Sequence, residues 1–72
     1  MLVQTESGDY INLTRGHIVT VPEDDMFQVT IIPMRGHTEH VVESFYDRDE
    51  AQVLMDRIAD DFMAGRKMFR QS

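Results

Sequence analysis

Three side chains that often bind metal ions lie close together in the sequence: His37, His40 and Glu43. On a helix, residues three apart share a face and could hold one ion, but this segment is expected to be a turn followed by a strand. In a strand, residues three apart point to opposite faces, whereas a zinc site needs three or four converging ligands. His17 could join from a neighbouring strand. The spacing favours solvated polar residues over a metal site, and no cofactor is expected.

The carboxylates and hydroxyls do not form a recognisable catalytic pattern. Glu39 and Glu43 share a strand face but would lie about 13 Å apart at ~3.3 Å per residue, too far for two groups that act on one bond. The acidic turn at residues 23–25 lacks the alternating ligands and glycine of a calcium loop. No serine lies in a nucleophile elbow, and the glycines form no phosphate-binding loop. The sequence therefore predicts a protein that is not an enzyme.

The charge balance argues against most polyanionic partners. The net charge is −6, with 13 acidic and 7 basic residues, and binding to nucleic acid or anionic membrane depends on Lys and Arg at phosphates. The exception is a basic tail, in which Arg66, Lys67 and Arg70 could contact single strands together with exposed sheet aromatics. A nucleic-acid-binding regulator is therefore the alternative function. The competing interpretation is that the tail complements the negative end of the preceding helix dipole.

The length of 72 residues predicts a single domain over residues 1–72 with a thin margin of stability, because so short a chain buries only about 60% of its unfolded surface. The chain contains no cysteine, and small folds without such reinforcement often gain stability by oligomerising. No apolar run approaches the ~20 residues that span a bilayer, and no basic-then-apolar leader precedes Leu2. These features favour a soluble cytoplasmic protein.

The clearest predicted element is an amphipathic helix over residues 48–64, followed by a short basic tail at 66–72. Asp47 is expected to cap this helix by accepting a hydrogen bond from the backbone N–H of Glu50, whose side chain reaches back. Gly65 suits the position just after the helix. Apolar residues recur at helical spacing: Ala51, Leu54, Met55, Ile58, Ala59 and Phe62. This stripe must be covered, and within one copy only the upstream chain can cover it.

Short segments rich in strand-favouring residues precede the helix and are separated by turn residues. They predict four or five strands within residues 2–46, with a bend at Arg15-Gly16 and a hairpin turn at 34–37. Residues 27, 29 and 31 form one face of the clearest strand, but the strand at 38–45 has two mixed faces. The predicted fold class is α+β, an antiparallel sheet of four or five short strands with one C-terminal helix packed on one face.

One helix covers only one face of such a sheet, and the other face still carries apolar side chains. Beside Ile32 and Met34 they include either Val41 with Phe45 or Val42 with Tyr46, and the chosen candidates are Ile32, Met34, Val42 and Tyr46. Because an exposed apolar patch often marks an interface, we expect a homodimer that meets through this face. The alternative is that a bend at Gly16 curls the sheet and buries these residues internally. The favoured function is a non-enzymatic, homo-oligomeric protein–protein interaction or accessory module.

Two local motifs carry a resemblance to known proteins. A Tyr-Ile-Asn-Leu strand at residues 10–13 follows a Gly-Asp turn, and Phe45, Asp47, Glu50 and Ala51 form a Phe-x-Asp-x-x-Glu-Ala helix start. With the β-rich segment between them, they give a layout that resembles small uncharacterised bacterial and phage proteins with a β-meander and one C-terminal helix. The resemblance spans most of the chain. Because its motifs are a turn and a cap, it implies a fold and no activity, cofactor or site residue.

Overall fold

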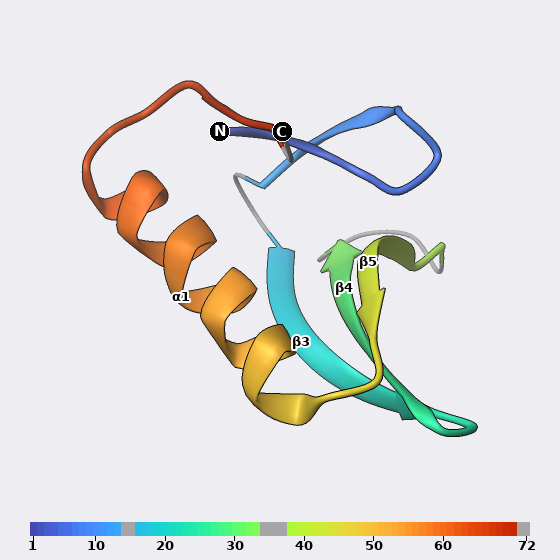
Figure 1. Cartoon of the computed structure of the whole chain (residues 1–72). Helices are drawn as coiled ribbons and strands as arrows, with labels where there is room; N and C mark the ends of the chain where they lie inside the picture. The colour runs from blue at the N-terminus through green and yellow to red at the C-terminus, as the bar shows by residue number, and fades with distance from the viewer. Residues whose placement is uncertain (14–15, 34–37, 71–72) are drawn as a thin grey trace.

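The computed structural model describes residues 1–13, 16–33 and 38–70, and this part of the chain forms six strands and one helix (Figure 1). Two sheets of three strands have the orders β2-β1-β6, the first sheet, and β3-β4-β5, the second sheet. The α+β class and the packing of the helix on a sheet are confirmed. The elements in chain order are β1 (Leu2–Gln4), β2 (Tyr10–Asn12), β3 (Gly16–Glu23), β4 (Met26–Pro33), β5 (His40–Phe45), α1 (Arg48–Met63) and β6 (Met68–Phe69).

Helix α1 begins and ends within one residue of the predicted limits, at Arg48–Met63. The carboxylate of Asp47 caps it, because Oδ1 accepts a hydrogen bond of 2.9 Å from the backbone N–H of Asp49. The expected donor, Glu50, is wrong, since the short Asp side chain bonds the second helical residue and not the third. Gly65 has a φ of 74°, the left-handed conformation that ends many helices.

The buried stripe of α1 is narrower than the sequence predicts. Its buried residues are Ala51, Leu54 and Ile58. Met55 packs against this cluster and accepts a hydrogen bond at Sδ from the Thr20 hydroxyl, with 2.8 Å between the two atoms. The expected burial of Ala59 and Phe62 is wrong, because Ala59 is exposed and 45% of Phe62 is exposed. The last turns of the helix therefore extend past the sheet that it covers.

The second sheet is a strongly paired antiparallel unit with β4 in the centre. A turn of two residues, Asp24 and Asp25, joins β3 to β4, and Glu23 pairs with Met26 on either side of it. Asp24 has a φ of 53°, a conformation that a tight hairpin requires and that costs a residue with a Cβ some energy. The bends expected at Arg15-Gly16 and at residues 34–37 fall wholly or partly on positions 14–15 and 34–37, which lie outside the described residues.

An irregularity in β5 explains why the sequence shows two mixed faces there. Val29 pairs with Glu43 and Thr30 pairs with Val41, which leaves Val42 as an extra residue in the register. Such a bulge interrupts the alternation of side chains along a strand. Phe45 and Val42 would lie on opposite faces of a regular strand, yet both contact the core. The expectation that Val42 lies on the uncovered face is therefore wrong, because its side chain is fully buried.

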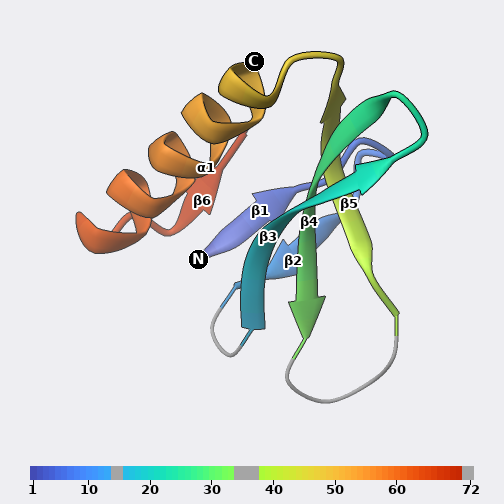
Figure 2. The same ribbon diagram turned by 90° about the horizontal axis from the view of Figure 1, so that it is seen from below.

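The C-terminal tail forms a sixth strand that pairs with the first. Leu2 lies opposite Met68 and Val3 opposite Phe69 in a parallel arrangement, and the Leu2 N–H donates a hydrogen bond of 2.9 Å to the Lys67 carbonyl. Figure 2 shows β6 beside β1 and close to the helix. The expectation that every pair is antiparallel is wrong here, because nearly the whole chain forms the long crossover that a parallel pair needs.

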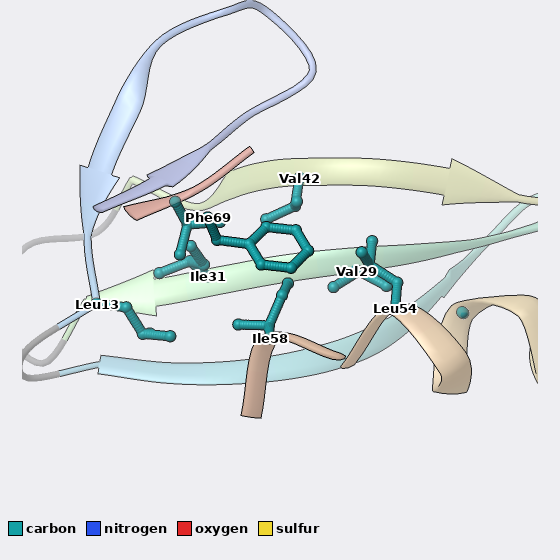
Figure 3. Close-up of a cluster of buried hydrophobic side chains, with 9 residues drawn as sticks. Leu13, Val29, Ile31, Val42, Leu54, Ile58 and Phe69 are labelled. Atoms are coloured by element: carbon teal, nitrogen blue, oxygen red, sulfur yellow. The ribbon is translucent and has the colours of Figure 1, made fainter. Parts of the chain in front are cut away.

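The core lies between the inner faces of the two sheets and the helix, and Figure 3 shows the Phe69 ring among side chains from all three. The guanidinium of Arg57 covers this ring, with 5.5 Å between its Cζ and the ring centroid. The tail therefore acts as an apolar clasp. The buried hydrophobic residues are Val3, Leu13, Val29, Ile31, Val42, Ala51, Leu54, Ile58 and Phe69.

Candidate interaction surface

The second sheet has a face that points away from α1. Residues opposite each other in antiparallel strands share a face, and the register places Thr30 between Val19 and Val41 on the side away from the buried Val29 and Ile31. The single helix of the described residues packs on the inner face. We call the other side the outer face; it consists of His17, Val19, Val21, Glu23, Met26, Gln28, Thr30, Ile32, Val41 and Ser44.

The outer face is apolar in the middle and polar at its ends. Thr30 is 1% exposed at its centre, and the flanking side chains of Val19, Val41 and Ile32 are half-buried. Charged residues make up 28% of the chain, yet among the ten outer-face positions only Glu23, at the end beside the β3–β4 turn, is Asp, Glu, Lys or Arg. Depletion of charge at the centre of a surface is typical of protein interfaces. The outer face therefore has the composition of a contact surface.

The structure places the four residues expected at the interface in different settings. Ile32 lies on the outer face, as expected. Val42 lies in the core, Tyr46 is 79% exposed on the link between β5 and α1, and Met34 lies outside the described residues. Sequence reasoning missed Val19 and Val21, and it left Val41 as an alternative to Val42. The signal for the first two was present, because His17, Val19 and Val21 alternate with Ile18 and Thr20 along one strand.

The histidines do not converge on a metal site. His17 pairs with Ile32 of the outer face, whereas His40 pairs with Ile31, whose side chain lies in the core. The two imidazoles therefore belong to opposite faces of the second sheet. His37 lies outside the described residues. Among the residues that the structure does describe, no three His, Asp or Glu side chains lie close enough to hold a metal ion.

Two shallow hollows lined by described residues flank β5. The larger, about 320 Å³, lies between β5 and the β1–β2 turn and is lined by Gln4, Thr5, Glu6, Gly8, Val42 and Glu43. The smaller, about 250 Å³, lies between β5 and α1 and is lined by Glu43, Phe45, Glu50, Val53, Leu54 and Arg57.

The hydroxyl groups beside the larger hollow form hydrogen bonds within the β1–β2 turn. Thr5 Oγ1 lies 2.9 Å from Ser7 Oγ and donates a hydrogen bond of 3.3 Å to the Asp9 carbonyl. The backbone N–H of Gly8 donates to the Thr5 carbonyl at 3.0 Å, and Gly8 has a φ of 92°. These groups hold the turn together. Neither lining combines a hydroxyl nucleophile with a histidine.

The basic tail is held to the rest of the molecule. Arg66 Nε lies 3.4 Å from Asp61 Oδ1, and Lys67 accepts the hydrogen bond from β1 at its carbonyl. Arg70 Nε donates to Met68 Sδ at 3.2 Å. Arg66, Lys67 and Arg70 are exposed, but they flank the two-residue strand β6, and Arg66 lies beside Asp61 near the helix end. They do not form a free basic arm.

No helix in the described part of the chain is long and apolar enough to cross a membrane. Comparisons of the chain with protein-family models, curated proteins and solved structures found no match. The residues of this chain are therefore the basis for a proposal of function. Among its surfaces, the outer face has an apolar, charge-poor centre.

Proposed function

We propose that the protein is a non-enzymatic interaction module that self-associates through the outer face of its second sheet. The observation that supports this most directly is the row of Val19, Thr30 and Val41, with Ile32 beside it, on a face whose centre carries no Asp, Glu, Lys or Arg. The chain has 13 acidic residues, and the one on this face, Glu23, lies at its end beside the β3–β4 turn.

Self-association would supply the cover that the outer face lacks. Full burial of an exposed Val or Ile side chain contributes about 1.5–3 kcal/mol, and Val19, Ile32 and Val41, which are half-buried in one copy, would each gain part of this. Several such contributions matter to a domain this small, because the free energy of unfolding of natural domains is about 5–15 kcal/mol. Two copies that bury Val19, Ile32 and Val41 against each other would therefore gain stability as they assemble.

Other features of the chain agree with this role. The acidic residues other than Glu23 lie outside the outer face and would keep the remaining surface from nonspecific association with nucleic acid or anionic lipid. A cytoplasmic location forms part of the proposal, since a chain without cysteine needs no oxidising compartment. The alternative function is nucleic-acid binding by Arg66, Lys67 and Arg70 with exposed sheet aromatics; we favour self-association because Arg66 lies 3.4 Å from Asp61 and the tail is anchored by β6.

The test is the molar mass in solution, measured by light scattering after size-exclusion chromatography at two protein concentrations. We expect an assembly heavier than one chain of 8.4 kDa. Ile32→Lys places a charge in the middle of the outer face and is expected to lower this molar mass. Circular dichroism confirms that the variant remains folded.

Val53→Lys is the matched control, because Val53 is an apolar residue of α1 that is 58% exposed and lies away from the outer face. It introduces the same charge and should leave the molar mass unchanged. A wild-type protein that is monomeric at both concentrations would contradict the proposal. So would a folded Ile32→Lys variant that assembles as the wild type does.

A further inference from the structure

The two edges of the second sheet differ. On the β5 edge, the carbonyl of Val41 accepts a hydrogen bond of 3.2 Å from the backbone N–H of Glu6, so the β1–β2 turn covers part of that edge. On the other edge, β3 is eight residues long, and no strand of the described residues pairs with it there. An edge of this length presents a row of unpaired backbone groups that can add another strand.

The β3–β4 turn determines which backbone groups of β3 point outward. In a hairpin with a two-residue turn, the flanking residues, here Glu23 and Met26, bond to each other. Bonding then alternates along the strand, so that Ile18, Thr20 and Pro22 direct their backbone groups to the open edge. Proline has no N–H and is tolerated where that group would face outward from an edge strand. The position of Pro22 thus agrees with the assignment of its backbone groups to the open edge.

We infer that β3 pairs with β3 of a second copy, antiparallel and about a two-fold axis at Thr20. In this register the N–H of each Thr20 donates to the carbonyl of the partner's Thr20. The N–H of each Ile18 donates to the carbonyl of the partner's Pro22. Four backbone hydrogen bonds form, and the outward N–H groups of residues 18 and 20 in each copy are all used.

The side chains of β3 suit this register. Val19 lies opposite the partner's Val21 on each side of the axis, and His17 lies opposite the partner's Glu23 at each end. The strand therefore matches itself, apolar to apolar in the middle and imidazole to carboxylate at the ends. A register centred on Ile18 would place His17 opposite Val19 and lose this charge complementarity. The second copy is thus the occupant that the sequence of β3 fits.

The inferred pairing extends the outer face. Residues 17, 19, 21 and 23 all point to that side, so the outer faces of two copies become one continuous surface on a sheet of six strands. The helix contacts β3, β4 and β5 from the inner side and stays on that side in the pair. Edge pairing goes beyond the proposed function, because it needs no outer-face contact. If both contacts form, two such sheets pack face to face about 10 Å apart.

Cysteine cross-linking tests the register directly, because the chain has no cysteine of its own. Val19 and the partner's Val21 form a pair without mutual backbone hydrogen bonds, whose Cα atoms lie about 4.5–5.5 Å apart, within reach of a disulfide. An equimolar mixture of Val19→Cys and Val21→Cys should therefore give several-fold more cross-linked dimer on mild oxidation than either variant alone. Identical residues lie diagonally across the axis, about 7–8 Å apart or more.

Val53→Cys is the matched control, since Val53 is 58% exposed on α1 and lies away from both the β3 edge and the outer face. Its mixture with Val19→Cys should remain uncross-linked. The Val19–Val21 cross-link should also persist when both chains carry Ile32→Lys, which tests the outer face alone. Equal cross-linking in the mixture and in the single variants overturns edge pairing, whatever Ile32→Lys does to the molar mass. If Ile32→Lys leaves the molar mass unchanged while the Val19–Val21 cross-link still forms, only the proposed function is overturned.

Discussion

The inner and outer faces of the two sheets carry similar residues in different surroundings. Ile31 and Ile32 are neighbours in β4, yet Ile31 is 1% exposed in the core and Ile32 is half-buried on the outer face. In β6, Phe69 is 3% exposed and Met68 is 40% exposed. The residue types on the two faces are nearly the same. The exposure of the side chains therefore differs because of what covers each face. The folding of one copy explains the inner residues and leaves the outer ones without a structural role.

The largest expected effect comes from Phe69→Ala. The ring lies among Val42 and Ile58 and beneath Arg57, and truncation of a buried Phe costs about 3–5 kcal/mol. A loss of this size is comparable with the whole stability of a small domain. Urea denaturation measured by circular dichroism should show a fully or largely unfolded variant.

Met68→Ala is the control for Phe69→Ala, because Met68 lies on the opposite side of the same strand. Its side chain is 40% exposed, and we expect a cost below about 1 kcal/mol. Equal losses from the two substitutions would mean that β6 contributes through its backbone pairing and not through its aromatic clasp.

The second effect in size comes from Ile31→Ala, compared with Ile32→Ala. Truncation of a buried Ile costs about 2–5 kcal/mol, whereas a half-buried residue without cover should cost about 1 kcal/mol or less. The free energy of unfolding should be measured at a low protein concentration, because assembly adds stability to the folded state. If the two values coincide there, something in the single chain already covers the outer face.

A smaller effect is expected from Asp47→Ala, which loosens the helix that covers the inner face. The substitution removes the 2.9 Å bond to the Asp49 N–H, and loss of such a cap costs about 1 kcal/mol. Thermal unfolding measures it. Asp60→Ala, near the other end of the helix, is the control and should be neutral or slightly stabilising, because a carboxylate is unfavourable there. A neutral Asp47→Ala would show that packing alone fixes the start of α1.

The elements with a local signal could be predicted from the sequence. The helical spacing of apolar residues and the cap residue Asp47 predicted the helix. The alternation of side chains along β4 predicted the face that carries the buried Val29 and Ile31. The tolerance of glycine for a positive φ predicted the end of the helix at Gly65, which has a positive φ. Each of these depends on residues that are close in the chain, and so each is written in a short stretch of sequence.

The elements that depend on distant partners could not be predicted. Strand β6 has only two residues, and its parallel pairing with β1 joins the two ends of the described chain. The bulge that buries Val42 depends on the register between β4 and β5, which no pattern within β5 alone determines. For the same reason, Ile32 was placed correctly on the outer face and Val42 was not. Val19 and Val41 join Ile32 only after strand pairing brings them together.

The smallest expected effect comes from Thr30→Val, at the centre of the outer face. Thr30 is 1% exposed, and its hydroxyl donates to the Gln28 carbonyl at 3.4 Å, longer than a strong hydrogen bond. Valine keeps the shape and removes a poorly bonded buried hydroxyl, which should raise the free energy of unfolding by about 0.5 kcal/mol.

The control for Thr30→Val is Thr5→Val. The Thr5 hydroxyl holds the β1–β2 turn through Ser7 and the Asp9 carbonyl, and its loss should cost about 1 kcal/mol. Opposite signs for the two substitutions, measured by urea denaturation, would show that polarity matters in the turn and not on the outer face. A loss above about 1 kcal/mol for Thr30→Val would instead show that this hydroxyl is an essential polar group. The outer face would then be a surface with a built polar centre, and an apolar contact with a second copy would no longer explain it.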